Sequence, residues 1–188
     1  MEPDVVAAPD EGVWRVGRDP DPLSASLSVG TSHLAEPHTG NRFDSPSGTY
    51  GVRYFATTLD GCFGETLARY RADKKLAKII GSEWADMGFM NVGDIPADWR
   101  QRRVAVHVRF PKDELNRDVQ FLDVESMQTR EALLPDFEPL LALSRLNTDW
   151  ECWAAFDRVP IEELTRRPIL REDEALNRTA TLYGLTIY

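Results

Sequence analysis

Four polar side chains in the N-terminal part of the sequence could carry out chemistry together. They are Arg15 in a short apolar segment, Arg42 between a glycine and a turn, Tyr54 near the end of an alternating segment, and Glu65. An arginine can bind a phosphate group through two parallel charged hydrogen bonds, and a tyrosine offers an aromatic face together with a hydroxyl. A carboxylate stabilises positive charge that develops in a transition state. The set could therefore bind an anionic ligand with an aromatic group and stabilise a cation formed from it.

These residue types also have ordinary structural interpretations. Glu65 and Arg69 are spaced i, i+4, and such a pair stabilises a helix surface by about 0.2–0.5 kcal/mol. Tyr54 could be a core tyrosine whose hydroxyl reaches the edge, and Arg15 could stack on an aromatic ring or pair with an acidic side chain. Arg53 alternates away from Tyr54 and is interpreted as a solvated or paired charge. Both the chemical and the structural interpretations stay open at this stage.

The hydrophobic pattern predicts the elements that must position these residues. Residues 49–56 alternate as a strand does, and the turn after them offers Thr58 or Asp60 as the N-cap of a helix that runs from about Gly61 into residues 71–78. Further strands are expected at 13–16, 103–110 and 119–124, and further helices at 137–144 and 176–183. Because strands and helices do not alternate one by one, we predict an α+β fold with a mixed or antiparallel sheet and flanking helices.

The length of 188 residues suits one domain. We expect residues 1–12 to form a mobile N-terminal tail and residues 13–188 to form a single domain. Gly184 is a natural stop for the last helix, and the residues after it have the pattern of the beginning of a strand. We therefore expect the domain to lack its C-terminal strand segment.

The charge of the chain excludes several classes of partner. The sequence has 31 acidic and 22 basic side chains and a formal net charge of −9. Nucleic-acid binding requires a basic surface, and an anionic membrane surface repels a protein of this sign. The apolar runs are too short for a membrane helix, and the first residues do not have the pattern of a signal peptide. We therefore expect a cytoplasmic protein that by itself binds neither nucleic acid nor membrane.

Cysteine and histidine form no strong metal or redox motif. Cys62 and Cys152 lie far apart in the sequence, which is typical of two reduced thiols and not of a disulfide framework or a zinc motif. His33, Glu36 and His38 cluster in a proline-containing loop that we interpret as polar rather than as metal-binding. Glycine-rich nucleotide motifs and common hydrolase motifs are absent from the sequence as well. We expect no metal and no bound cofactor.

The order and spacing of several short motifs resemble the RES domain family, which is named for its arginine, glutamate and serine. The matching segments are Trp14-Arg15-Val16, Gly40-Asn41-Arg42-Phe43-Asp44, Gly51-Val52-Arg53-Tyr54-Phe55-Ala56 and Gly64-Glu65-Thr66-Leu67. The resemblance implies a fold related to ADP-ribosyltransferases. It also implies that Arg15 and Tyr54 bind NAD+ and that Arg42 and Glu65 are catalytic. Neither Ser126 nor Ser144 has the context of the family's serine, so neither is assigned its role.

RES domains are typically toxins of bacterial toxin–antitoxin pairs that consume NAD+ by cleaving its nicotinamide–ribose bond. The resemblance therefore implies an NAD+-cleaving toxin whose acceptor is phosphate, water or a protein side chain, with NAD+ as substrate and a protein antitoxin as partner. Such an enzyme requires the four residues to converge on one cleft. The alternative is a RES-like binding module with incomplete catalysis that acts through protein contacts or nucleotide sensing. A delivered antibacterial effector with the same chemistry would have the same residues.

Overall fold

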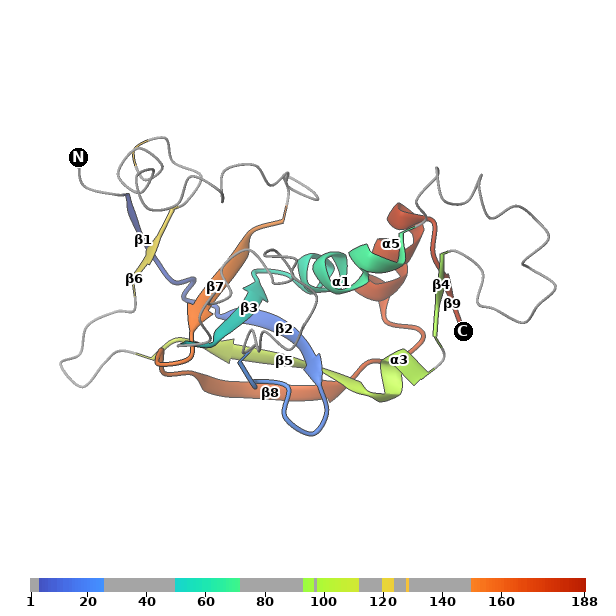
Figure 1. The fold of residues 1–188 in the computed structure, drawn as a ribbon, viewed down its shortest axis with the longest axis horizontal. Coiled ribbons are helices and arrows are strands. Elements are labelled where there is room, and N and C mark those ends of the chain that lie inside the picture. The colour runs from blue at the N-terminus through green and yellow to red at the C-terminus, as the bar shows by residue number, and fades with distance from the viewer. Residues whose placement is uncertain are drawn as a thin grey trace, which may run out of the picture.

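A computed structural model describes residues 4–25, 50–71, 93–96, 98–111, 120–123, 128 and 150–188. These residues form a five-stranded antiparallel sheet, two small two-stranded sheets and a few helices (Figure 1). The α+β prediction with a mainly antiparallel sheet is therefore confirmed. The helix predicted at 137–144 lies outside the described residues.

The main sheet has the strand order β7-β3-β2-β5-β8. Its strands are β2 (Val13–Arg18), β3 (Val52–Ala56), β5 (Arg103–Arg109), β7 (Cys152–Phe156) and β8 (Glu162–Pro168). β2 pairs with β5 along its whole length, but it pairs with β3 only through Trp14 and Ala56. The two strands that carry Arg15 and Tyr54 are therefore paired at one position and not along their whole length.

The sheet has a hydrophobic core on each face. Val106 and Val108 of β5 are fully buried in one core cluster, whereas the neighbouring Ala105 is fully buried in the other. This confirms the alternation predicted for residues 103–110. The cluster of Ala105 also contains Phe63 and Leu176, which come from the helices α1 and α5, so these helices cover one face of the sheet.

The helix after β3 begins where the sequence predicts. In α1 (Leu59–Leu67), Thr58 is the N-cap, and its side-chain oxygen accepts a hydrogen bond from the Gly61 N–H at 3.2 Å. The chain continues as the 3-10 helix η1 (Ala68–Tyr70), and Arg71 has left the helical conformation. The helix is therefore shorter than predicted, and residues 72–78 lie outside the described residues.

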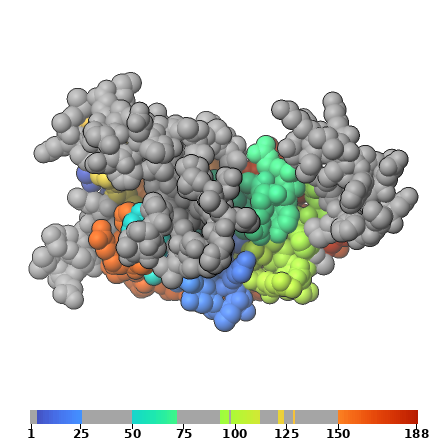
Figure 2. Space-filling view, in the orientation of Figure 1, coloured from blue at the N-terminus to red at the C-terminus, as the bar shows by residue number. Residues whose placement is uncertain are grey.

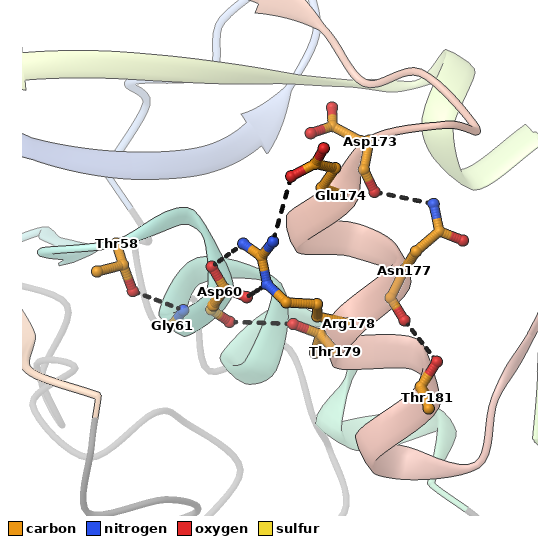
Figure 3. A network of polar contacts seen from close by, with 9 residues as sticks. All are labelled: Thr58, Asp60, Gly61, Asp173, Glu174, Asn177, Arg178, Thr179 and Thr181. Atoms are coloured by element: carbon orange, nitrogen blue, oxygen red, sulfur yellow. Dashed lines mark hydrogen bonds and ion pairs between the residues drawn. The ribbon is translucent and has the colours of Figure 1, made fainter.

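The last helix is fixed to the first turn of α1 by polar contacts. α5 (Glu174–Tyr183) ends at Gly184, whose φ of 66° is the left-handed conformation expected of a helix stop. Figure 3 shows Arg178 donating two 2.8 Å hydrogen bonds to the Asp60 carboxylate, while the Thr179 hydroxyl donates to the Asp60 carbonyl at 3.4 Å. These contacts help to determine where the middle of α5 lies relative to the first turn of α1.

The N-terminal segment differs from the expected mobile tail. Residues 5–7 form the strand β1 (Val5–Ala7), which pairs with β6 (Gln120–Leu122). Val6 lies opposite Phe121, and both pack against the core cluster that contains Val106. The apolar pair therefore gives this segment a hydrophobic partner that the local sequence does not reveal.

Several other elements were not predicted. The sequence of β7 is an apolar run, so the alternation of its buried and exposed residues is not visible in the residue types. Most residues of β8 are exposed, so its sequence has no apolar face. The short helix α3 (Asp98–Gln101) and the strand β4 (Asp94–Ile95) were also missed. The strand expected after Gly184 is confirmed as β9 (Thr186–Ile187), which pairs in parallel with β4.

Candidate active site

Three of the four predicted site residues belong to the described part of the chain. Glu65 lies in α1, which reaches the molecular surface (Figure 2), Tyr54 lies in β3, and Arg15 lies in β2. Arg42 lies outside the described residues. The structure therefore relates three of the four residues to one another. Tyr54 and Glu65 share one side of β3, whereas the alternation of β2 directs Arg15 to the other side, so the structure does not bring these three side chains to one face.

Glu65 lies next to the thiol of Cys152. The Cys152 Sγ atom is 3.9 Å from Glu65 Oε1 and donates a hydrogen bond to it. Partial burial raises the pKa of Glu65, and the thiol's hydrogen bond opposes this increase. Partial burial and the Glu65 carboxylate together raise the pKa of Cys152 to about 12, so the thiol stays protonated and keeps its donor. Both side chains are exposed at the surface, and the carboxylate lies against the thiol.

Helical spacing allows an i, i+4 ion pair between Glu65 and Arg69, but the structure gives Arg69 a different partner. The Arg69 guanidinium lies over the ring of Tyr70, 4.9 Å from the ring centroid, and donates to the Tyr70 hydroxyl at 3.1 Å. The Arg69 guanidinium therefore contacts Tyr70, the next residue in the chain.

Tyr54 lies on the same side of the sheet as the contact between Glu65 and Cys152. In the pairing of β3 with β7, Tyr54 is opposite Ala154 and Ala56 is opposite Cys152. Residues two apart in a strand, and residues directly opposite each other, share a face of the sheet. The structure therefore places the side chains of Tyr54 and Glu65 on one side of β3.

Arg15 is bound by the carbonyl oxygens of the chain itself. Its guanidinium donates to Pro22 O at 2.7 Å, Ser24 O at 2.9 Å and Tyr54 O at 3.2 Å. It also lies 5.8 Å from the ring centroid of Phe55, which faces the opposite side of β3 from Tyr54. Burial lowers the pKa of Arg15, and the nearby Arg53 lowers it further, yet a guanidinium remains charged at neutral pH.

Arg53 is a polar residue whose role the sequence did not reveal. Its guanidinium donates to Leu23 O at 2.8 Å and to Asp157 O at 3.0 Å. The prediction that it points away from Tyr54 agrees with the alternation of β3. Its carbonyl partners come from distant parts of the chain, so no local pattern could have identified them.

Arg15 and Arg53 together hold residues 22–24 against β2 and the start of β3, and we call this arrangement the arginine clamp. Two glycines allow the close approach of this segment. A Cβ atom on Gly17 would overlap the Pro22 backbone, and one on Gly51 would lie 2.6 Å from the Ala25 Cβ atom. The clamp therefore fixes the chain immediately before the segment that contains Arg42.

Aromatic side chains lie beside Glu65. Trp150 packs so closely on Gly64 that a Cβ atom there would overlap the indole ring. The ring centroids of Trp150 and Tyr183 are 6.1 Å apart in an edge-to-face arrangement, and the Arg71 guanidinium lies 4.5 Å from the Tyr183 ring centroid. We call this group, with Glu65 and Cys152, the Glu65 cluster. Its aromatic members were missed as site residues, although the alternation of Trp150 and Cys152 could have suggested that they share a side.

The described residues contain no group of three or more His, Cys, Asp or Glu side chains that could hold a metal ion. The histidines of the cluster at residues 33–38 lie outside them. No helix in the described ranges is long and apolar enough to cross a membrane. A shallow depression on α5 is lined by Glu174, Asn177, Arg178 and Thr181, and it includes none of the predicted site residues.

Comparison with known families finds a match to the RES domain over residues 12–176. No curated protein and no solved structure matches the chain significantly. The matched range includes Arg15, Arg42, Tyr54 and Glu65 and covers most of the sequence. The chain therefore belongs to the RES domain family.

Proposed function

We propose that this protein is an enzyme that cleaves the nicotinamide–ribose bond of NAD+. RES domains are generally associated with NAD+-cleaving toxins of toxin–antitoxin pairs, and the family match is the first support for the proposal. The observation that carries it is the position of Glu65, a carboxylate with a raised pKa on the side of β3 to which Tyr54 points. The related proposals are an ADP-ribosyltransferase-like fold, a cytoplasmic location and a protein antitoxin as partner.

The chemistry of the reaction explains why a carboxylate is needed. When the bond from ribose C1′ to the pyridinium nitrogen breaks, the electron pair leaves with nicotinamide, which becomes neutral. The ribose then carries oxocarbenium character, which a nearby anion stabilises. An acceptor oxygen from water, phosphate or a protein side chain forms the new bond to C1′ and loses its proton to solvent. In this mechanism, Glu65 stabilises the cation and Tyr54 stacks on the nicotinamide ring.

The arginines would bind the pyrophosphate of NAD+. Arg15 donates one N–H from each of its three nitrogens to a carbonyl of the described residues, and a guanidinium carries five N–H groups. The other two N–H groups have no partner among the described residues, and in this proposal they bind a phosphate oxygen. Arg42 supplies the second charge in this proposal, and the net charge of −9 makes such local positive charge necessary for a dianionic group.

Nicotinamide release tests this function directly. The purified full chain is incubated with NAD+, with and without inorganic phosphate, and nicotinamide and the ribosyl product are separated by chromatography. We expect nicotinamide to appear with the wild type and to be nearly absent with Glu65→Gln. Glu174→Gln is the matched control because Glu174 is an exposed α5 carboxylate outside the Glu65 cluster. Intact NAD+ with the wild type would exclude the proposal.

Nucleotide binding without cleavage is the second candidate function. It is favoured by the three carbonyls that already occupy Arg15, because they give this arginine a structural role even without a ligand. Calorimetric titration with NAD+ separates the two candidates. Binding of NAD+ without nicotinamide release would support the binding module.

A further inference from the structure

The hydroxyl of Tyr183 is buried and has no hydrogen-bond partner among the described residues. Burial of an unpaired hydroxyl is unfavourable, and most buried polar atoms in folded proteins do have a partner. The other buried unpaired atoms of the described ranges, Trp99 Nε1 and Arg100 Nε, belong to α3. Of these three buried unpaired atoms, the Tyr183 hydroxyl is therefore the one that belongs to the Glu65 cluster.

Contacts on several sides hold the Tyr183 ring in place. The edge of Trp150 packs against it at 6.1 Å between centroids, and the Arg71 guanidinium lies 4.5 Å from its centroid. Trp150 in turn rests on Gly64, the residue before Glu65. The ring also packs against the core cluster that contains Leu176. Trp150 therefore links the Tyr183 ring to the turn of α1 that carries the carboxylate proposed to act on the substrate.

The hydroxyl keeps its proton at neutral pH. Burial raises the pKa of Tyr183, Arg71 opposes this increase, and the neighbouring Glu65 and Cys152 add to it. A protonated phenol can donate one hydrogen bond and can also accept one. A sugar hydroxyl matches this capacity because it both accepts and donates.

We propose that the Tyr183 hydroxyl is a substrate-binding group that donates a hydrogen bond to a hydroxyl of the ribose from which nicotinamide leaves. This inference rests on the proposed function, because Glu65 acts where the ribose develops positive charge. The hydroxyl is buried in the free protein, so it gains this partner only when substrate binding displaces the side chains that cover it. Tyr183 lies beyond the residues 12–176 matched by the family, so the family motif does not assign it.

The test compares Tyr183→Phe, which removes only the oxygen atom, with the wild type and with Tyr70→Phe. Tyr70 is a suitable control because its hydroxyl accepts a hydrogen bond from Arg69 within η1. We expect Tyr183→Phe to raise the KM for NAD+ by about 3- to 10-fold, the range expected for one lost hydrogen bond. Its melting temperature should not fall, because no partner within the protein is lost. Tyr70→Phe should leave the KM unchanged.

Substrate analogues identify the hydroxyl that Tyr183 contacts. With NAD+ analogues that lack either the 2′- or the 3′-hydroxyl of the nicotinamide ribose, the effect of Tyr183→Phe on kcat/KM should disappear for one analogue and persist for the other. Persistence with both analogues would overturn the inference. It would also be overturned by an unchanged KM for NAD+, or by a clear loss of thermal stability in Tyr183→Phe.

These outcomes are distinguishable from failure of the proposed function. If the wild type releases no nicotinamide, the proposed function fails and the inference fails with it. If the wild type is active and Tyr183→Phe matches it with NAD+, only the inference fails.

Discussion

The arginine clamp and the Glu65 cluster lie on opposite sides of β3, and their polar groups are satisfied to different degrees. In the clamp, the two guanidinium groups donate to five backbone carbonyls at 2.7–3.2 Å. In the Glu65 cluster, the carboxylate has a raised pKa, its thiol neighbour lies 3.9 Å away, and the Tyr183 hydroxyl has no partner in the described residues. The first region is therefore held together by hydrogen bonds within the protein, whereas the second keeps a buried hydroxyl without a partner among the described residues.

This difference separates two kinds of site residue that sequence motifs treat alike. Arg15 and Glu65 both belong to the family pattern, yet Arg15 also holds the fold together and Glu65 does not. Replacing a residue that stabilises the folded chain should lower the stability of the protein. Replacing a residue that acts on the ligand should lower its activity. Substitutions in the two regions should therefore give opposite profiles.

The largest effect is expected for Glu65→Gln. Nicotinamide release should fall about 100- to 1,000-fold, the usual loss when one group that stabilises transition-state charge is removed. The free energy of unfolding at pH 7 should not fall. A folded-state pKa above the unfolded value means that folding disfavours the charged carboxylate, and this penalty is present at pH values above the folded pKa. Glutamine removes the charge and with it the penalty. Lower stability in this variant would contradict the comparison.

Arg15→Met should show the opposite profile in a denaturant titration. We expect the free energy of unfolding to fall by about 3 kcal/mol, because three carbonyls lose a charged donor and partial exposure reduces each contribution. Arg158→Met is a fitting control, since Arg158 is exposed and contacts only the Phe156 ring among the partners described for it. If Arg15→Met unfolds like the wild type, the guanidinium has no structural role and the clamp is wrong as described.

Arg53→Met should destabilise the protein less, by about 1.5 kcal/mol, because two carbonyl bonds are lost and one of them is exposed. Both arginines hold the same segment, residues 22–24, so their effects should not add. The double variant should lose less than the sum of the single variants, since the segment can detach only once. Strict additivity, measured by the same titration, would show that the two arginines act independently.

The elements that the sequence predicted are those whose signals are local. The alternation of residues 103–110, the Thr58 cap and the Gly184 stop are each read within a few residues, and each is confirmed. The strands β7 and β8 escaped prediction because neither alternates between apolar and polar residue types. β7 is apolar even at its exposed positions, and β8 is a mostly exposed edge strand.

The same distinction applies to the site. Arg15, Tyr54 and Glu65 belong to short motifs that a linear pattern can recognise. Trp150 and Tyr183 join Glu65 only after β7 and α5 have folded back onto α1, so residues far apart in sequence create the cluster. Arg53 likewise acquires its partners Leu23 and Asp157 through tertiary contacts. Single-sequence patterns carry no information on such contacts, and this is why the site could be predicted only in part.

The smallest effect is expected for Cys152→Ala, and it concerns the pH dependence of the reaction. The carboxylate of Glu65 is active as the anion, so nicotinamide release should fall about tenfold per pH unit below its pKa. Burial raises this pKa and the Cys152 thiol lowers it, so alanine should move the acid limb of the pH–rate profile to higher pH. At pH values well above the limb the rate should stay close to that of the wild type. Cys152→Ser keeps a donor and should leave the limb in place or move it to lower pH. A limb that moves to lower pH with alanine would show that the thiol does not stabilise the anion, and the assigned role of the Cys152 hydrogen bond would then be wrong.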